Sequence, residues 1–222
     1  MPQKFAPPRG GQLGSSMPKL SPSKIVCVGR NYSAHAKELG NDVPKEPLLF
    51  LKPPSSLIGG GESIRLPTVS NQDEYEGEIG VVVSTRLRKA SAAEARKAVG
   101  GIVAANDVTA RDLQKSDSQW TRAKGFDTFC AVGEMADAPA DLTSLSVTTK
   151  VNGQVRQRGN GTDMVFDIPA LLSYISGVMT LEPGDLVLTG TPEGVGTLAP
   201  GDVVEVEIAG VSRVSNPVTR DA

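Results

Sequence analysis

Three glutamates at alternating positions are the residues of this chain whose type and spacing most clearly could do chemistry. Side chains alternate between the two faces of a strand, so Glu74, Glu76 and Glu78 would share one face of a strand over 73–83. Like charges on one face repel, and a hard divalent cation would neutralise them and take their oxygens as ligands. Gly77 would let a ligand approach the backbone between them. An edge strand with a solvated acidic end explains the pattern equally well, so this stretch alone leaves both interpretations open.

A fourth carboxylate, Asp107, follows the apolar strand expected over 101–105 and precedes a short helix that Thr109 is expected to cap. At the end of a rigid strand it could join Glu76 and Glu78 in an all-oxygen site suited to Mg²⁺ or Mn²⁺. An ordinary turn residue is the alternative for Asp107, and Asp107 taken by itself favours that alternative.

The single histidine, His35, has a carboxylate at helix spacing. Ser33 is the expected N-cap and Gly40 the expected stop of a short helix, on which His35 and Glu38 would lie on one face. A general base with an orienting carboxylate requires this pairing. Spacing alone still favours an ordinary surface or satisfied core histidine.

Short strands dominate the rest of the sequence. No regular βαβ alternation is present, so the sequence predicts a β-rich α+β fold with a few brief helices. Residues 1–23 are expected to form a flexible N-terminal arm, and residues 24–222 one catalytic domain. The expected strands are 24–28, 48–51, 64–67, 73–83, 101–105, 147–151, 154–157, 186–188 and 203–208, and the expected helices are 33–39, 91–99, 110–114 and 167–175.

The composition limits the classes of partner that we expect for this protein. With 23 Lys and Arg against 25 Asp and Glu, the net charge of -2 argues against a nucleic-acid footprint or a polybasic membrane patch. No apolar run approaches the length of a membrane span. Cys27 and Cys130 both lie in apolar company, as expected for buried free thiols in a reducing compartment. We therefore expect a cytoplasmic protein with no nucleic-acid or membrane partner.

Several sequence blocks, taken together, resemble one known family. The chain resembles the fumarylacetoacetate hydrolase family from Lys24 to about Pro217, with the blocks in the family's order. The length is similar to its short single-domain branch, which includes acylpyruvase and oxaloacetate decarboxylase proteins. The blocks are Gly29-Arg30-Asn31-Tyr32, His35-Ala36-Lys37-Glu38, Pro47 to Pro53, Tyr75-Glu76-Gly77-Glu78, Asn106 to Gln114, Arg122 to Asp127 and Leu188 to Gly196.

The resemblance implies a mixed β-sandwich roll, a homodimer and a Mg²⁺ or Mn²⁺ site. It also assigns roles. The implied roles are metal ligation by Glu76, Glu78 and Asp107, a catalytic His35 and Glu38 dyad on a lid that orders with ligand, a buried catalytic Lys124, and substrate contacts from Gln114, Thr191, Arg30 and Arg111. Glu74 has no ligand role in the family pattern, so we expect it outside the metal's immediate ligands or facing solvent.

The reaction these roles suggest is metal-assisted hydrolysis of the carbon–carbon bond in a 2,4-diketo acid of the acylpyruvate or fumarylpyruvate type, giving pyruvate and a carboxylic acid. His35 would activate water, and Lys124 would stabilise the developing enolate. The same enolate arises in oxaloacetate decarboxylation and in isomerisation of a 2-hydroxyhepta-2,4-diene-1,7-dioate in aromatic catabolism. A metal- or acid-binding protein without turnover is the non-enzymatic alternative. The sequence does not identify the acyl group.

Overall fold

The computed structural model describes residues 20–40 and 42–221. Most of the predicted arm, residues 1–19, lies outside this range. The residues that connect it to the domain pack on the body: Pro22 is buried, and Leu20 packs against a cluster of buried apolar side chains.

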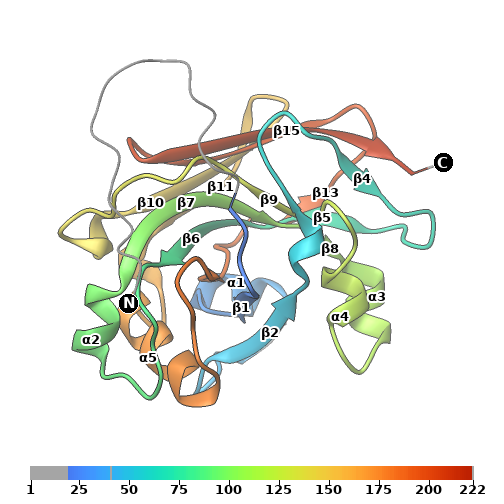
Figure 1. The fold of residues 1–222 in the computed structure, drawn as a ribbon. Coiled ribbons are helices and arrows are strands. Elements are labelled where there is room, and N and C mark those ends of the chain that lie inside the picture. Colours follow the sequence, from blue (N-terminus) through green and yellow to red (C-terminus); the bar gives the residue numbers. More distant parts are fainter. Residues whose placement is uncertain (1–19, 41, 222) are drawn as a thin grey trace.

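A seven-stranded sheet is the largest element of the fold (Figure 1). Two of its neighbouring pairs, β1 with β12 and β3 with β9, are parallel, and the other pairs are antiparallel. Its central strands are near-continuous runs of buried apolar residues, as expected for a sheet covered on both faces. In spatial order the strands are β2 (Leu48–Lys52), β1 (Ile25–Gly29), β12 (Leu186–Leu188), β6 (Gly77–Val83), β7 (Val99–Asp107), β9 (Cys130–Val132) and β3 (Leu57–Ile58).

A five-stranded sheet lies across the top of the molecule in Figure 1. Its long strands alternate buried and more exposed residues, which is the pattern of a sheet with one face on the core. The hairpin predicted at Asn152-Gly153 is confirmed, and both residues have positive φ angles, 52° and 76°. In spatial order the strands are β11 (Gln154–Asn160), β10 (Ser146–Val151), β14 (Val203–Ile208), β15 (Ser212–Arg220) and β4 (Ile64–Leu66).

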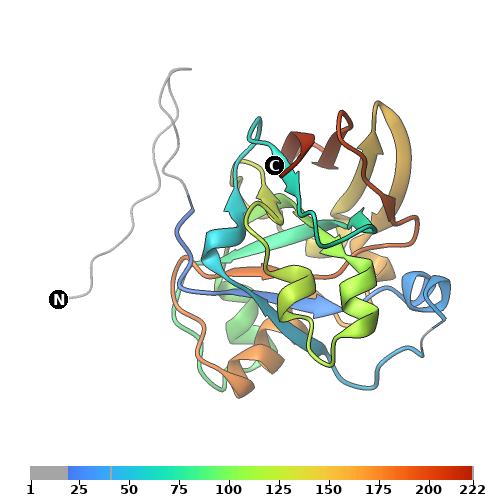
Figure 2. The ribbon, with the colours of Figure 1, turned by 90° about the vertical axis from the view of Figure 1, so that its right-hand side faces the viewer.

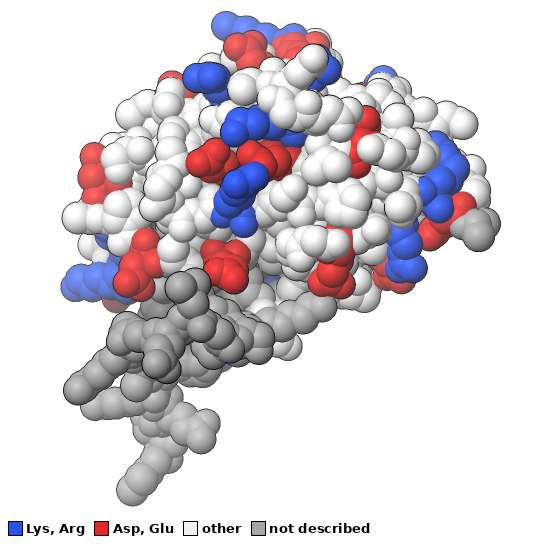
Figure 3. Space-filling model, turned by 90° about the horizontal axis from the view of Figure 1, so that it is seen from above, with Lys and Arg blue, Asp and Glu red and all other residues white. Residues whose placement is uncertain are grey.

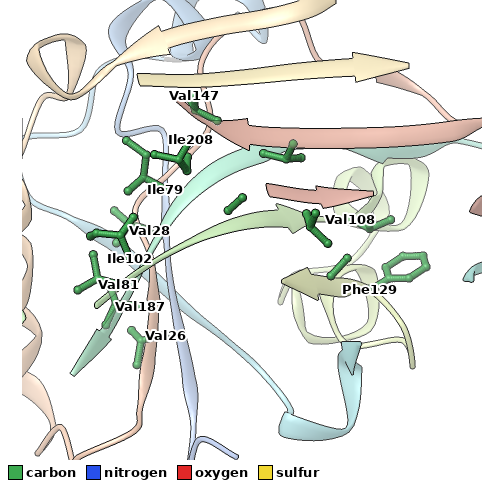
Figure 4. Packing of buried hydrophobic residues seen from close by; sticks show 14 of the residues in the cluster. Val26, Val28, Ile79, Val81, Ile102, Val108, Phe129, Val147, Val187 and Ile208 are labelled. Carbon is green, nitrogen blue, oxygen red and sulfur yellow. The ribbon is translucent and has the colours of Figure 1, made fainter. Parts of the chain in front are cut away.

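The main core lies between these two sheets. Val147 and Ile208 from the upper sheet face Ile79 and Ile102 from β6 and β7, and all four side chains are buried (Figure 4). Burial of this apolar area fixes β6 and β7, the two strands whose ends carry the acidic residues.

The strand predicted over 73–83 divides into two at Glu76. A three-stranded sheet of β13 (Gly196–Thr197), β5 (Asp73–Tyr75) and β8 (Thr109–Ala110) takes the first part, and β6 continues the second. The Glu76 N–H donates to Asn106 Oδ1 (3.0 Å), and the Glu76 carbonyl accepts from Asp107 N (2.8 Å). The chain therefore crosses from one sheet to another between the carboxylates.

Within residues 20–40 and 42–221, five short helices lie at the periphery of the sheets. The predicted capping box at Ser91 and the Asp167 cap are confirmed, but the Ser33 and Thr109 caps are wrong, because Tyr32 and Ala110 occupy those N-cap positions. Figure 2 shows α1 beyond the end of β1 and apart from α3 and α4. The helices are α1 (Ser33–Glu38), α2 (Ala92–Lys97), α3 (Arg111–Ser116), α4 (Thr121–Lys124) and α5 (Ile168–Val178), with 3₁₀ turns at Pro54–Ser56, Leu142–Ser144 and Gly161–Asp163.

Charged side chains of both signs are interspersed on the face of the molecule shown in Figure 3. The outer face of the five-stranded sheet contributes such pairs, including Lys150 with Glu205 and Glu207, and Arg213 with Glu205. No helix within the described residues is both long and apolar enough to cross a bilayer. The architecture confirms the predicted β-rich α+β fold with a few brief helices.

Candidate active site

Glu76, Glu78 and Asp107 form a buried acid cluster. A carboxylate oxygen of each lies within 4.8 Å of the others, and all three side chains are buried. The antiparallel pairing of β6 with β7 produces this meeting, since Gly77 lies opposite Asn106 and Glu78 opposite Ala105. Residues far apart in sequence thus present oxygens to one point, as a hard divalent cation requires.

Two buried lysines neutralise part of this charge. Lys124 Nζ lies 2.8 Å from Glu76 Oε2 and 2.7 Å from Asp107 Oδ2. Lys52 Nζ lies 2.6 Å from Asp107 Oδ1 and 3.1 Å from the Val108 carbonyl. Lys52 was not predicted as a site residue, although it ends an apolar strand, and a lysine that is buried there is almost never without a partner.

Arg111 binds the other side of the cluster. Its guanidinium donates to Glu74 Oε2 (2.7 Å), to Glu76 Oε1 (2.5 Å) and to Gln114 Oε1 (2.5 Å). Glu74 therefore holds the arginine that holds Glu76. Its place on the same face as Glu76 has a structural reason that does not require it to ligate a metal.

The charges of the cluster are unevenly compensated. Burial raises the pKa of Glu78, and the neighbouring carboxylates Asp107 and Glu76 raise it further. Burial also disfavours ionised Glu76, but Lys124 and then Arg111 outweigh that effect and hold its pKa below the usual range. Glu78 is thus the carboxylate with most to gain from an added cation.

The donor set fits a hard cation. The three carboxylates supply oxygens, and Mg²⁺ and Mn²⁺ both accept an all-oxygen shell. Near them, the buried Nδ2 of Asn106 has no hydrogen-bond partner among the described residues. The site therefore combines uncompensated negative charge with incompletely satisfied polar groups.

The backbone between Glu76 and Glu78 is in close contact with the five-stranded sheet. A Cβ at Gly77 would lie 1.8 Å from Thr149 Oγ1, so the position excludes any side chain. Gln157 on β11 accepts from Gly77 N (2.9 Å) and donates to Thr191 Oγ1 (2.8 Å), and Thr191 Oγ1 donates to the Gly77 carbonyl (2.9 Å). The sequence analysis did not identify Gln157, because a single inward polar residue in a strand carries no distinctive pattern.

His35 lies buried above the cluster on α1. Its Nδ1 lies 3.2 Å from Glu38 Oε2, and Glu38 Oε1 accepts from Gly194 N (3.0 Å). With Nδ1–H donated to Glu38, Nε2 carries the lone pair that can accept a proton. The described geometry thus permits a base with an orienting carboxylate.

A small cavity of about 50 Å³ lies between α1 and the acid cluster. Of the ten residues that the sequence predicts for the site, eight line it, and the other two, Glu38 and Asp107, contact the lining residues His35 and Lys124. Trp120 and Phe50 form an apolar wall, packed edge to face at 5.3 Å between ring centroids. Arg30 lies over the Trp120 ring at 6.0 Å with a φ of 59°, a left-handed conformation that is costly for arginine.

The chain matches one known family of proteins. Residues 24–219 match the family described as fumarylacetoacetate (FAA) hydrolase C-terminal. The chain is 45% identical over 204 residues to the mitochondrial oxaloacetate tautomerase FAHD1 of Arabidopsis thaliana, covering 89% of this chain and 92% of that protein. It is 46% identical over 195 residues to the mitochondrial oxaloacetate decarboxylase of Dictyostelium discoideum, covering 85% and 89%.

A solved structure agrees with these matches. Fumarylpyruvate hydrolase from Pseudomonas aeruginosa, crystallised with Mn²⁺ and pyruvate, is 28% identical, has a TM-score of 0.86, and is matched over 93% of both chains. The match over nearly the whole chain and the identity to both eukaryotic proteins lead to one conclusion: this protein is a member of the fumarylacetoacetate hydrolase family.

Proposed function

We propose that this protein is a metal-dependent enzyme that forms the enolate of a short 2-keto acid with a carbonyl or carboxylate at the next carbon, and that oxaloacetate is the best-fitting substrate. The observation that carries the proposal is the acid cluster of Glu76, Glu78 and Asp107 facing His35 across a small cavity. The choice of oxaloacetate is supported by the 45% and 46% identical relatives, which are an oxaloacetate tautomerase and an oxaloacetate decarboxylase.

The charges that line the cavity favour a ligand with two carboxylates. Arg30 lines the cavity and forms no ion pair with a carboxylate of the described residues. Arg111 and Lys124, by contrast, are both paired with acidic side chains. A second carboxylate on the substrate would pair with Arg30, as the distal carboxylate of a four-carbon dicarboxylic keto acid can do.

The residues act in separate roles. Glu76, Glu78 and Asp107 would hold Mg²⁺ or Mn²⁺, which as a Lewis acid stabilises negative charge on the keto oxygen. Lys124 adds a fixed positive charge beside the same point, and Thr191 lines the cavity next to Gly77, whose carbonyl accepts from its hydroxyl.

Proton transfer falls to His35. Its Nε2 removes the proton from the carbon between the two carbonyl groups, and delivery of that proton to the enolate oxygen gives the enol, while the reverse transfer restores the keto form. Glu38 stabilises the imidazolium that forms in between. When the bond from that carbon to its carboxylate breaks instead and carbon dioxide leaves, the enolate of pyruvate remains, and it takes up a proton on carbon to give pyruvate.

The test is a panel of oxaloacetate, acetylpyruvate, fumarylpyruvate and a hydroxymuconate-type dienoate, each assayed with Mg²⁺, with Mn²⁺ and with chelator. We expect loss of enol absorbance or release of carbon dioxide from oxaloacetate, abolished by chelator. Binding of Mn²⁺ without turnover of any of these substrates would contradict the proposal and favour the non-catalytic alternative.

Hydrolysis of a 2,4-diketo acid is the second candidate, and the His35–Glu38 pair favours it, because hydrolysis must activate water whereas tautomerisation only moves a proton. Rapid cleavage of acetylpyruvate or fumarylpyruvate with slow turnover of oxaloacetate would make the protein a hydrolase. Isomerisation of the dienoate remains a third outcome of the same panel. The expected homodimer stays a prediction, which sedimentation analysis can test.

A further inference from the structure

The loop over 190–196 contacts both the acidic stretch and helix α1. Gly194 forms two of these contacts: its N–H donates to Glu38 Oε1 (3.0 Å), and its carbonyl accepts from the Tyr75 hydroxyl (3.0 Å). Tyr75 is the residue immediately before Glu76. A continuous series of hydrogen bonds therefore runs from the acidic stretch through Gly194 and Glu38 to His35.

The backbone at Gly194 has little freedom to move. Its φ is +95°, and a Cβ there would lie 2.2 Å from the Arg156 carbonyl oxygen, so only glycine fits. Gly196 pairs with Tyr75 in the three-stranded sheet, and a Cβ on Gly196 would lie 2.8 Å from the Tyr75 hydroxyl. The hydroxyl is thus enclosed by two glycines and bonded to one of them.

Helix α1 depends on contacts of this kind. It has six residues and no side-chain N-cap, and helices this short are not stable by themselves. Asn31 anchors the chain before it, with its carbonyl accepting from Val165 N (2.8 Å) and its amide donating to the Thr189 carbonyl (2.8 Å). At the C-terminal end of α1, the hydrogen bond from Gly194 N to Glu38 anchors the helix in the same way.

We propose that Tyr75 is a positioning residue for His35. Its hydroxyl fixes Gly194, Gly194 fixes Glu38, and Glu38 orients the imidazole over the cavity. The proposal rests on the proposed function in so far as His35 is the proton-transferring group. It makes the residue next to a metal ligand responsible for the orientation of the base on the opposite wall.

The test compares Tyr75→Phe with the wild-type full chain in Mn²⁺, using hydrogen–deuterium exchange of peptides that cover 33–39. Loss of one hydrogen bond predicts exchange about tenfold faster in this segment. We expect kcat for oxaloacetate to fall by about the same factor, with KM and Mn²⁺ affinity little changed. In a His35→Ala background the Tyr75 change should cost no further activity, since it acts through His35.

Two controls separate this effect from general loosening. Tyr174→Phe removes a hydroxyl whose bond to Glu46 Oε2 is long, 3.4 Å, and should leave the exchange of 33–39 unchanged. Gly194→Ala should resemble or exceed Tyr75→Phe, whereas Gly201→Ala, at the same φ of +95° but with open space around its Cβ, should not.

Unchanged exchange of 33–39 in Tyr75→Phe would overturn the proposal whatever the activity, and so would an activity loss that adds fully to that of His35→Ala. Absence of wild-type turnover together with faster exchange in Tyr75→Phe would instead contradict the proposed function and leave the positioning by Tyr75 standing.

Discussion

The two ends of the β6–β7 pair are equally buried and opposite in character. At one end Val81 pairs with Ile102, and both are fully buried in the main core. At the other end Glu78 lies opposite Ala105, with Asp107 two residues further along β7, and both carboxylates are buried as well. Burial stabilises the first end by removing apolar area from water, at roughly 25 cal/mol per Å². At the second end burial costs free energy unless every charge finds a partner.

The difference shows how this fold separates stability from chemistry. The apolar end holds the two strands in register, and that register brings the carboxylates of the other end together against their repulsion. Lys52, Lys124 and Arg111 reduce the repulsion without removing it. The acid cluster is therefore held together mainly by the apolar end, and under the proposed function a cation would complete it.

The largest effect is expected from Glu78→Gln. The change removes the charge whose neighbours are carboxylates, so the metal-free protein should melt at a higher temperature. The rise in melting temperature on adding Mn²⁺ should disappear, and turnover should fall by at least about 100-fold. Calorimetry with and without Mn²⁺ measures both effects. Glu207→Gln, on the exposed face of β14, is the matched control and should change neither.

Ile102→Ala changes the apolar end of the same strand pair. A buried aliphatic side chain truncated to alanine should lower the free energy of unfolding by about 2–5 kcal/mol. The additional stabilisation by Mn²⁺ should remain, because no group of the acid cluster is altered. Urea denaturation with and without the metal checks this. If the Mn²⁺ increment vanished in Ile102→Ala, the two ends would not be separable.

Lys52→Met tests whether the buried lysine orients a ligand. The substitution keeps most of the side-chain volume but removes the donor to Asp107 Oδ1, leaving that oxygen without its cation. We expect Mn²⁺ to bind about 10–100-fold more weakly, as for loss of a group that orients a metal ligand. Isothermal titration measures the affinity. Tighter binding would show that the charge of Lys52 opposes the metal more than its hydrogen bond orients Asp107.

The smallest effect concerns a charge near the apolar end. Asp185, whose carbonyl accepts from Val83 N, also accepts at its carboxylate from Ser23 N (3.0 Å), Ser23 Oγ (2.7 Å), Glu182 N (2.8 Å) and the Lys24 ammonium. Burial disfavours the charged form, but the hydrogen bonds from Lys24 and Ser23 outweigh it and lower the pKa of Asp185.

The sign of the pH effect follows from the lowered pKa. The stabilisation is complete above the unfolded-state pKa of about 3.9 and is lost as pH falls through the lower folded-state value. Asp185→Asn should therefore be less stable than wild type at pH 7, and the gap should narrow below about pH 4. Urea denaturation between pH 7 and pH 3 checks this, and a gap independent of pH would contradict the assignment.

Much of the fold followed from local sequence signals. The Asn152-Gly153 turn, the Ser91 capping box and the apolar strands are determined by neighbouring residues, and the structure has them where they were predicted. The Thr109 cap was wrong because its hydroxyl donates to the Asp107 carbonyl (2.9 Å) while its backbone pairs with Glu74 in a small sheet. That competition depends on a strand 35 residues away, which local reasoning cannot weigh.

The site residues also divide into those that local sequence signals predict and those that depend on distant contacts. The carboxylates and His35 could be named because their types and spacing are unusual, and the family resemblance supplied Lys124. Lys52 and Gln157 could not be named from spacing, because each acts through a partner distant in sequence: Asp107 on β7 and Gly77 at the start of β6. Their contributions depend on how the strands cross.

The contact of Thr149 with Gly77 ties the backbone of the acid cluster to the five-stranded sheet. A Cβ between Glu76 and Glu78 would lie 1.8 Å from Thr149 Oγ1, so the two sheets are in contact at this point with no space between them. A substitution that pushed the sheets apart here would move the backbone that carries both carboxylates, whereas a truncation such as Ile102→Ala leaves this contact in place. Under the proposed function, a larger residue at position 149 should therefore weaken Mn²⁺ binding even though Thr149 touches no carboxylate of the cluster.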